Sequence, residues 1–487
     1  MRRIEISLIF VLISVISTFG QEYQTINSNR IAFFGNGHGN IRCIRIDSVK
    51  HQSDSTLFPF ATIQQFGYDC FSPVAASWIG KSVTMEDDGL NKFINKTGDT
   101  ITLKVNASLG EKWIAFALND SLKIEATLIS HDTLTFLGIT DSVKTIKFQA
   151  YDKSMNQFDL EINYMNIQIS KFHGFITTMN FYFFPNFNAD YQYEILEEYH
   201  LIGLSSPKVG VNNLTWFEVN DFQEGDELHV LDESSCWYGD GYGSSLINKA
   251  IYKYLERTDY SDSIVYRYSR TQSTFTTFTD RSEFKYYNDT LTRTIKPDPQ
   301  FDKLPGEPII NENETFNFFM TNETPLSKLN PSGYERYRFN GDSCWQMVIV
   351  DGCLTNEKYI KGLGGPYYSC TQAFCLGGAK RKLVYYKKAG VSWGNPITVT
   401  EISDFPASKD IMIYPNPAKN QVVAKISNIN YQGLQILVYD IQGRLQKTKK
   451  LEIDNSMINI SDLNPGVYFL KIVDNVKILK MDRLIIE

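Results

Sequence analysis

Apolar and polar positions alternate through the first third of the chain. In residues 100–108 every second side chain is apolar, and residues 121–130 and 144–150 repeat this period of two. Such a period is typical of half-buried strands, and short turn sequences separate these segments as successive hairpins require. The pattern predicts one curved antiparallel sheet over residues 21–170, with these side chains facing a shared core: Ile101, Leu103, Val105, Leu122, Ile124, Ile146 and Phe148.

The middle of the chain, residues 171–399, is richer in tyrosine, glycine and cysteine and less regular. Residues 263–270 and 283–289 alternate as strands do. Helical spacing is scarce, and residues 245–257 are the best candidate for a helix because apolar side chains recur there on one side. The chain contains 28 tyrosines and 32 phenylalanines, which favour strands. We expect a β-rich, cysteine-containing domain here.

The N-terminus has the pattern of a secretory signal. Arg2 and Arg3 precede an apolar run over residues 6–16, and residues 18–20 offer small side chains at the positions that a signal peptidase reads. The run is too short to span a membrane, which needs ~20 apolar residues, and no other segment approaches that length. We expect residues 1–20 to be a signal peptide and the mature protein to be exported and not transmembrane.

Charge and cysteine content narrow the possible partners and the compartment. The formal net charge is −7, and the last 77 residues contribute +3 and the first 20 contribute +1, so the body between them carries −11. An acidic body argues against a nucleic-acid partner, which would need a basic face. Seven cysteines fit an oxidising compartment and allow three disulfides and one free thiol. A predicted hairpin turn at residues 351–352 disfavours a Cys344–Cys353 bridge.

Candidate chemistry is sparse. His38 lies between glycines in GNGHGN, which would leave its imidazole accessible, although an exposed turn explains the same residues. Asp226, Glu227 and His229 gather in DFQEGDELHV, yet without metal-ligand spacing, so that a turn entering a strand is the simpler interpretation. We assign no catalytic residue, no cofactor and no metal ligand. The basic, aromatic stretch over residues 380–388 suggests contact with a polyanion or a glycan, or lysines that protect a strand edge.

The C-terminal segment reads as a small domain of its own. After a polar linker over residues 400–410, Pro415 and Pro417 interrupt two strands, and because proline fixes φ and lacks a donor they should turn the chain over a sheet edge. A hairpin turn follows at residues 440–443, where Gly443 can adopt positive φ. About seven short strands and their turns predict an immunoglobulin-like β-sandwich.

Four blocks of this segment, YPNPAKN, LVYDIQGRL, DLNPGVYFLKI and the lysine-bearing final strand, occur in order over residues 411–487. Together they resemble the type A C-terminal sorting domain of type IX (Por) secretion, found in Bacteroidota. The resemblance implies export by Sec, passage through the type IX machinery, and removal of the domain by a sortase-like peptidase, with release or attachment to surface polysaccharide. The residues that carry it are Tyr414, Pro415, Asn416, Pro417, Tyr439, Asp440, Gly443, Arg444, Leu463, Gly466 and Tyr468.

The body gives weaker resemblances. Residues 222–229 and 361–368 are similar to stretches of other secreted Bacteroidota cargo, and the curved meander resembles the open barrels of lipoprotein carriers; neither implies a ligand. We therefore expect a mainly β protein with a curved antiparallel meander, an irregular β-rich middle domain and a small C-terminal sandwich. Its expected location is extracellular or at the cell surface, reached through the periplasm. We favour a binding or surface protein, and the alternative is an extracellular hydrolase, either a peptidase or a glycosidase.

Overall fold

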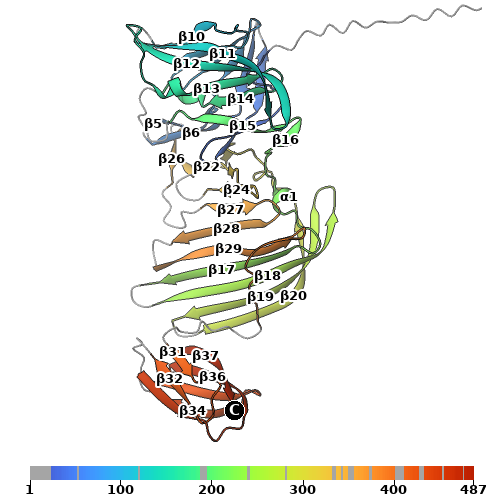
Figure 1. Cartoon of the computed structure of the whole chain (residues 1–487), viewed down its shortest axis with the longest axis vertical. Helices are drawn as coiled ribbons and strands as arrows, with labels where there is room; N and C mark the ends of the chain where they lie inside the picture. The colour runs from blue at the N-terminus through green and yellow to red at the C-terminus, as the bar shows by residue number, and fades with distance from the viewer. Residues whose placement is uncertain are drawn as a thin grey trace, which may run out of the picture. The chain divides into compact units, whose positions relative to one another are not determined.

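The computed structural model describes residues 23–487 apart from 52–53, 68, 119–120, 187–194, 239–241, 280–281, 332–335, 342–343, 349–355, 372–375, 401–410, 427–432, 452–453 and 475–476. The described chain is almost entirely β, which confirms the predicted fold class (Figure 1). Its helical parts are the short turns α1 (Trp216–Val219), η1 (Glu161–Tyr164) and η2 (Phe181–Phe183). Among the described residues no helix is long and apolar enough to cross a membrane.

Contacts divide the chain into two compact units. The first comprises Met1–Leu214, Pro299–Leu329 and Glu335–Val348, and the second comprises Thr215–Asp298, Asn330–Tyr334 and Ile349–Glu487. The first unit therefore takes strands from two distant parts of the sequence. We describe each unit by itself.

Two antiparallel sheets build the main core of the first unit. One has the strand order β10-β11-β12-β13-β14-β15-β1-β2, with β16 on β15, and the other has the order β3-β4-β7-β8-β9. The strands of the first sheet are β10 (Lys112–Leu118), β11 (Leu122–Phe136), β12 (Ile139–Asp152), β13 (Asn166–Ser170), β14 (Gly174–Met179), β15 (Glu198–Ser205), β1 (Ala32–Gly35), β2 (Ile41–Ile44) and β16 (Lys208–Gly210). Those of the second are β3 (Ile46–His51), β4 (Ser55–Pro59), β7 (Val83–Met85), β8 (Leu90–Ile94) and β9 (Thr100–Lys104).

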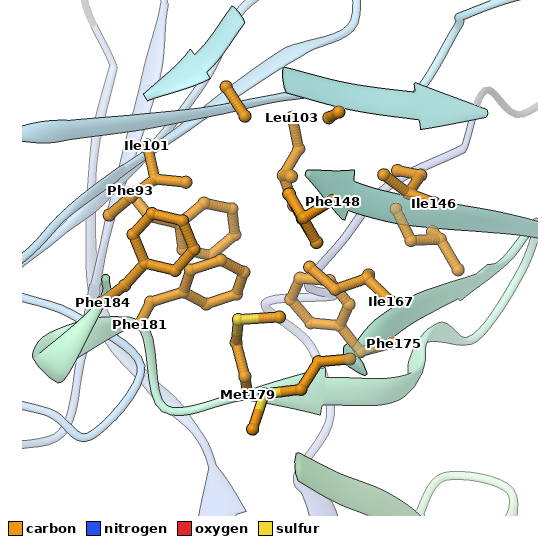
Figure 2. Packing of buried hydrophobic residues seen from close by; sticks show 14 of the residues in the cluster. Phe93, Ile101, Leu103, Ile146, Phe148, Ile167, Phe175, Met179, Phe181 and Phe184 are labelled. Atoms are coloured by element: carbon orange, nitrogen blue, oxygen red, sulfur yellow. The ribbon is translucent and has the colours of Figure 1, made fainter. Parts of the chain in front are cut away.

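The seven side chains predicted to share a core all do so. Each is at most 5% exposed and belongs to one hydrophobic cluster, to which Phe93, Phe181 and Phe184 contribute rings (Figure 2). The prediction of one sheet was wrong, however, because Leu103 lies in β9 of one sheet and Ile124 in β11 of the other. Alternation of period two fixes which side chains are buried, but it does not say whether two buried faces belong to one sheet or to two.

The remaining strands of the first unit form a smaller sheet and a hairpin. The sheet has the order β21-β22-β25-β26-β6-β5, and β23 pairs with β24. Their bounds are β21 (Ile309–Ile310), β22 (Glu314–Phe316), β25 (Tyr337–Phe339), β26 (Trp345–Met347), β6 (Cys70–Ala76), β5 (Thr62–Gly67), β23 (Phe319–Thr321) and β24 (Ser327–Asn330). A disulfide joins Cys70 to Cys344, beside the pairing of β6 with β26.

The cysteines agree with an oxidising compartment. Because Cys344 bonds to Cys70, the bridge to Cys353 that the sequence disfavoured is excluded. Cys236 and Cys370 are also disulfide-bonded, and Cys43 is a buried free thiol. Cys353, Cys375 and the predicted turn at residues 351–352 lie outside the described residues.

Long strands dominate the second unit. Their order is β20-β19-β18-β17-β29-β28-β27 (Figure 1), and β30 pairs with β29. They are β20 (Ser282–Ile295), β19 (Ile264–Phe278), β18 (Gly243–Asp259), β17 (Glu227–Trp237), β29 (Leu376–Lys388), β28 (Gly364–Thr371), β27 (Glu357–Ile360) and β30 (Val391–Gly394). The helix predicted over residues 245–257 was wrong: this segment lies in β18, which pairs with β17 over residues 243–253 and with β19 over residues 244–259 with one irregularity. Tertiary pairing overrides a helical spacing that only five apolar side chains supported.

The C-terminal segment has its own core. Its described strands form the sheets β31-β32-β35 and β34-β33-β36-β37, which confirms the predicted small sandwich. They are β31 (Ile411–Tyr414), β32 (Gln421–Ile426), β33 (Leu434–Asp440), β34 (Leu445–Lys450), β35 (Asp454–Asn459), β36 (Gly466–Asp474) and β37 (Lys477–Ile486). The buried cluster between them contains side chains of this segment alone. We call residues 411–487 the tail sandwich.

Candidate functional site

His38 lies where the sequence placed it, in the turn that joins β1 to β2. Its side chain is exposed, and its backbone N–H donates to Asn36 Oδ1 over 3.1 Å. Asn36 Oδ1 also accepts the N–H of Asn40, so this turn is closed by the side chain of an asparagine. A functional role for His38 stays a prediction.

Asp226, Glu227 and His229 lie at the turn that enters β17, as the simpler interpretation of the sequence had it. Asp226 is buried and its Oδ2 lies 2.5 Å from Lys388 Nζ. His229 Nδ1 accepts the backbone N–H of Ile397 over 3.0 Å, so Nε2 carries the ring proton and donates to Glu227 Oε1 over 2.7 Å. Both ring nitrogens are therefore engaged: Nδ1 fastens β17 to the chain at Ile397, and Nε2 bonds to Glu227 of the same strand.

Lys388 lies against both stretches that resembled other secreted cargo, residues 222–229 and residues 361–368. Its Nζ donates to the backbone oxygen of Asp221 over 2.6 Å, lies 5.8 Å from the ring of Phe222, and neutralises Asp226. Gly362 has φ +67 and a Cβ there would lie 2.9 Å from Lys388 Cε. Leu363 packs into the same small cluster as Phe222. These stretches are thus parts of one packed end of the sheet.

A groove in the first unit combines residues that the sequence did not single out as a site. It encloses about 540 Å³, which is within the usual range for small-ligand sites. Phe116, Leu122 and Phe184 form a buried apolar floor, and the rings of Phe116 and Phe184 meet edge to face at 5.5 Å. Phe158, 43% exposed, and the half-buried Phe183 also line it.

Two hydrogen bonds hold the groove in shape. The backbone N–H of Lys96 donates to Tyr182 O over 2.8 Å, and Asn95 Nδ2 donates to Phe184 O over 2.9 Å. They tie the aromatic segment around η2 to the turn between β8 and β9. The run of aromatics from Phe181 onward was the available sequence signal, but the floor also needs β10 and β11, which alternation alone does not bring to this place.

Two carboxylates line the groove, Asp99 and Asp152, and each accepts hydrogen bonds within a turn. Asp99 accepts a hydrogen bond from the hydroxyl of Thr97. Asp152 accepts the backbone N–H groups of Ser154 and Asn156 over 2.7 and 2.9 Å. Hydrogen bonds from the backbone and side chain of Asn156 hold the pKa of Asp152 below its usual value. Both carboxylates therefore already serve as hydrogen-bond acceptors within turns.

A second groove of the first unit is polar. It encloses about 440 Å³ and is lined by His51, Ser55, Glu86 and Asp87 among others. His51 Nδ1 lies 3.0 Å from Ser55 Oγ, and Glu86 forms an ion pair with Lys92. Among the described residues no group of three or more His, Cys, Asp or Glu side chains is placed to hold a metal ion.

The double-proline corner of the tail sandwich joins β31 to β32, which pair in one sheet, and contacts β37 of the other sheet. β31 ends at Tyr414, and four residues later Ala418 donates its N–H to Ile485 O over 2.8 Å and accepts that of Glu487 over 2.9 Å. Asn416 contributes from within the corner, because its Oδ1 accepts the N–H of Ile485 over 2.9 Å. The prolines lie outside the strands, as predicted, and the chain then returns to the sheet that it left.

The other motif residues of the tail sandwich occupy turns and central strands. Asp440 closes the β33–β34 hairpin by accepting the N–H groups of Gln442 and Arg444 over 2.9 and 3.0 Å, and Gly443 has φ +77. Burial alone would raise the pKa of Asp440, but the hydrogen bonds from Arg444 and Gln442 and the charge of Arg444 together outweigh it and lower the pKa. Tyr468, in central strand β36, donates its hydroxyl to Asn464 O over 2.8 Å. The remaining motif residues lie beside these: Tyr439 is the last residue but one of β33, Leu463 packs against the core, and Gly466 begins β36.

Comparison with solved structures gives two full-length but very weak likenesses. Both are extracellular domains of BT4673 from B. thetaiotaomicron, one described as a one component system and the other as a hybrid two component system. They align with 96% of this chain and with 99% and 98% of their own, at 9% and 7% identity. Their TM-scores of 0.13 and 0.15 carry no argument about fold. No curated protein matches the chain.

The tail sandwich gives a specific match. Residues 412–487 match the family described as the secretion system C-terminal sorting domain, at the position where the corner, hairpin and central strand are found. This domain implies interaction with the type IX secretion machinery and export to the cell surface or extracellular space. The chain thus ends in a type IX secretion C-terminal sorting domain.

Proposed function

We propose that the body of this protein is a secreted or cell-surface binding protein, and that the sorting domain is its export address. The single observation that carries the binding role is the apolar groove of the first unit. Its floor is buried and aromatic, and its polar lining includes two carboxylates already engaged in turns. Such a lining suits a ligand held by apolar contact and orientation.

The groove favours a ligand with an aromatic ring or a short alkyl chain. Phe158 and Phe183 present rings to the groove, and the Nζ of Lys96 lies 6.0 Å from the ring of Phe183. A cation at that distance from an aromatic face also attracts a weakly anionic end of a ligand. An amphiphile with an apolar body and a carboxylate end would use both features.

Removing the ring of Phe158 tests this proposal. Burying an aromatic side chain against a ligand contributes roughly 1.5–3 kcal/mol, so Phe158→Ala should weaken binding by about 10-fold to 100-fold. The measurement is titration of the full mature chain with 1-anilinonaphthalene-8-sulfonate and with decanoate. Phe172→Ala is the matched control, because Phe172 is also 43% exposed but does not line the groove. Equal binding by both variants, or none by the parent chain, would contradict the groove as the site.

The alternative function, an extracellular hydrolase, is favoured by one observation, the pairing of His51 with Ser55 in the polar groove. A base within hydrogen-bond reach of a hydroxyl is the first requirement of a nucleophilic site. Hydrolysis of peptide or glycoside substrates by the parent chain, lost in His51→Ala, would establish this alternative in place of the binding role.

The route of export is also part of the proposal. Residues 1–20 act as the Sec signal peptide, and the protein folds in the periplasm before it crosses the outer membrane. The linker over residues 400–410, of which 401–410 lie outside the described residues, is the cleavage site of a sortase-like peptidase. The body is then released or attached to surface polysaccharide.

A further inference from the structure

Several tyrosines lie on one face of the sheet in the second unit, at paired positions of neighbouring strands. Residues paired across neighbouring strands share a face. Tyr386 of β29 pairs with Trp393 of β30 and with Leu228, which pairs with Tyr252 of β18. Tyr252 in turn contacts Tyr268 of β19 at 6.0 Å. We call the face that carries Tyr252, Tyr268, Tyr287, Tyr386 and Trp393 the tyrosine face.

These rings are held in place and partly open to solvent. Tyr287 is 39% exposed and Trp393 is 55% exposed, and both lie on strands of this sheet. The ring of Trp393 stacks on that of Tyr386 at 5.7 Å, and the guanidinium of Arg270 lies 4.9 Å from the ring of Tyr287. Rings fixed in this way offer flat apolar surface at little cost in conformational entropy.

A ladder of polar side chains crosses the same face. Arg381 Nη1 donates to Asp232 Oδ1 over 2.9 Å, and Asn248 Nδ2 donates to Asp232 Oδ2 over 2.8 Å. Thr274 Oγ1 donates to Asn248 Oδ1 over 2.8 Å, which extends the ladder to β19.

The two arginines beside the ladder are paired with carboxylates. Arg381 is paired with Asp232, and Arg270 is paired in the same way with Asp289, with Nη2 2.6 Å from Oδ2. The part of the tyrosine face around the ladder is therefore amphipathic and close to electrically neutral.

The opposite face of the sheet has a different character. Lys380 and Lys382 are exposed there, because they alternate with Arg381 along β29. His229 also points to that face, because it pairs with Tyr385, which alternates with Tyr386 of the tyrosine face. Its ring accepts the backbone N–H of Ile397. The basic, aromatic stretch noted in the sequence therefore divides between two faces, and β29 is an interior strand rather than an edge.

We propose that the tyrosine face binds a neutral oligosaccharide. A sugar ring has an apolar face of C–H groups and an edge of hydroxyls, and it carries no charge. The rings of the tyrosine face can pack against the C–H face of a sugar. The amide, hydroxyl and carboxylate groups of the ladder can bond to its hydroxyls. The paired arginines leave little net charge beside the ladder, which suits an uncharged ligand. A polyanion would instead select the lysine-bearing face.

Affinity electrophoresis of the full mature chain through gels containing xyloglucan, soluble starch or yeast mannan tests the proposal, with heparin as the polyanion. We expect retardation by at least one neutral polysaccharide, weakened about 10-fold by Tyr287→Ala or Trp393→Ala and retained by Tyr287→Trp. Lys380→Ala/Lys382→Ala and Phe158→Ala should bind like the parent, so that failure of the groove and failure of this face are distinguishable. Both truncated rings are solvent-exposed, and circular dichroism confirms that each variant is folded.

Three outcomes would overturn the proposal. One is retardation by no neutral polysaccharide, and another is retardation by heparin alone that disappears in the lysine variant. The third is neutral-polysaccharide binding that survives loss of both Tyr287 and Trp393.

Discussion

Asp141 of β12 shows how a single carboxylate couples the first unit to pH. Its Oδ2 accepts the hydroxyl of Ser170 and the N–H of Phe172, the latter over 2.9 Å, and lies 3.0 Å from Nδ1 of His173. Burial would raise its pKa, but these hydrogen bonds outweigh burial and lower it. A lowered folded-state pKa contributes stability above the ordinary carboxyl pKa of ~3.9, and that stability is lost as pH falls through the folded value.

We therefore expect Asp141→Asn to reduce the acid sensitivity of the first unit. The parent chain should lose stability steeply below about pH 4, and the variant should start less stable at neutral pH and lose less on acidification. Urea denaturation midpoints between about pH 7 and pH 3 measure this, with the exposed Asp132→Asn as control. Midpoints of Asp141→Asn that run parallel to those of the parent would contradict the assignment.

Residue chemistry was only partly readable from the sequence. The turn at residues 221–226 was predicted, but its buried ion pair was not, because Lys388 lies far along the chain and reaches Asp226 only through the pairing of β17 with β29. The tautomer of His229 likewise depends on Ile397, a residue that no local pattern connects to it. Contacts of this kind follow from topology, which alternation does not specify.

At the scale of elements, the corner in the tail sandwich was predictable because proline acts locally. Neither Pro415 nor Pro417 can donate to a ladder, so a sheet edge was the remaining place for them. The prediction of a helix over residues 245–257 failed for the converse reason, because strands distant in sequence determine the pairing of this segment. The apolar groove was missed because its floor combines β10 and β11 with the segment after η2.

Asn416 should fasten the corner. Its Nδ2 donates to Arg483 O and its Oδ1 accepts from Ile485 N–H, so Asn416→Ala removes both bonds to β37. A typical hydrogen bond contributes about 1 kcal/mol net, so we expect the tail sandwich to lose about 1–2 kcal/mol of unfolding free energy. Asn416→Asp keeps the acceptor and should lose about half as much. Urea denaturation of the full chain measures both, and an unchanged midpoint in Asn416→Ala would contradict this role.

At the scale of the whole molecule, the tail sandwich is a sorting domain with a buried cluster of its own. Its buried cluster draws on residues 411–487 alone, and no cysteine of the chain lies beyond residue 375. Among the residues that the structure describes, the buried clusters around Phe93 and around Phe222 and the Cys70–Cys344 bond contain no residue of the tail sandwich. A domain built in this way can be removed or transferred without unfolding its neighbour.

Export of a truncated chain tests this account most directly. In a host with type IX secretion, the full chain should reach the cell surface or medium. A chain that ends at Val399 should stay inside the outer membrane while keeping its circular dichroism. Residues 400–487 fused to an unrelated Sec-exported domain should carry that domain outside. Cell fractionation and surface proteolysis measure all three, and delivery of the truncated chain to the surface at the level of the full chain would contradict the account.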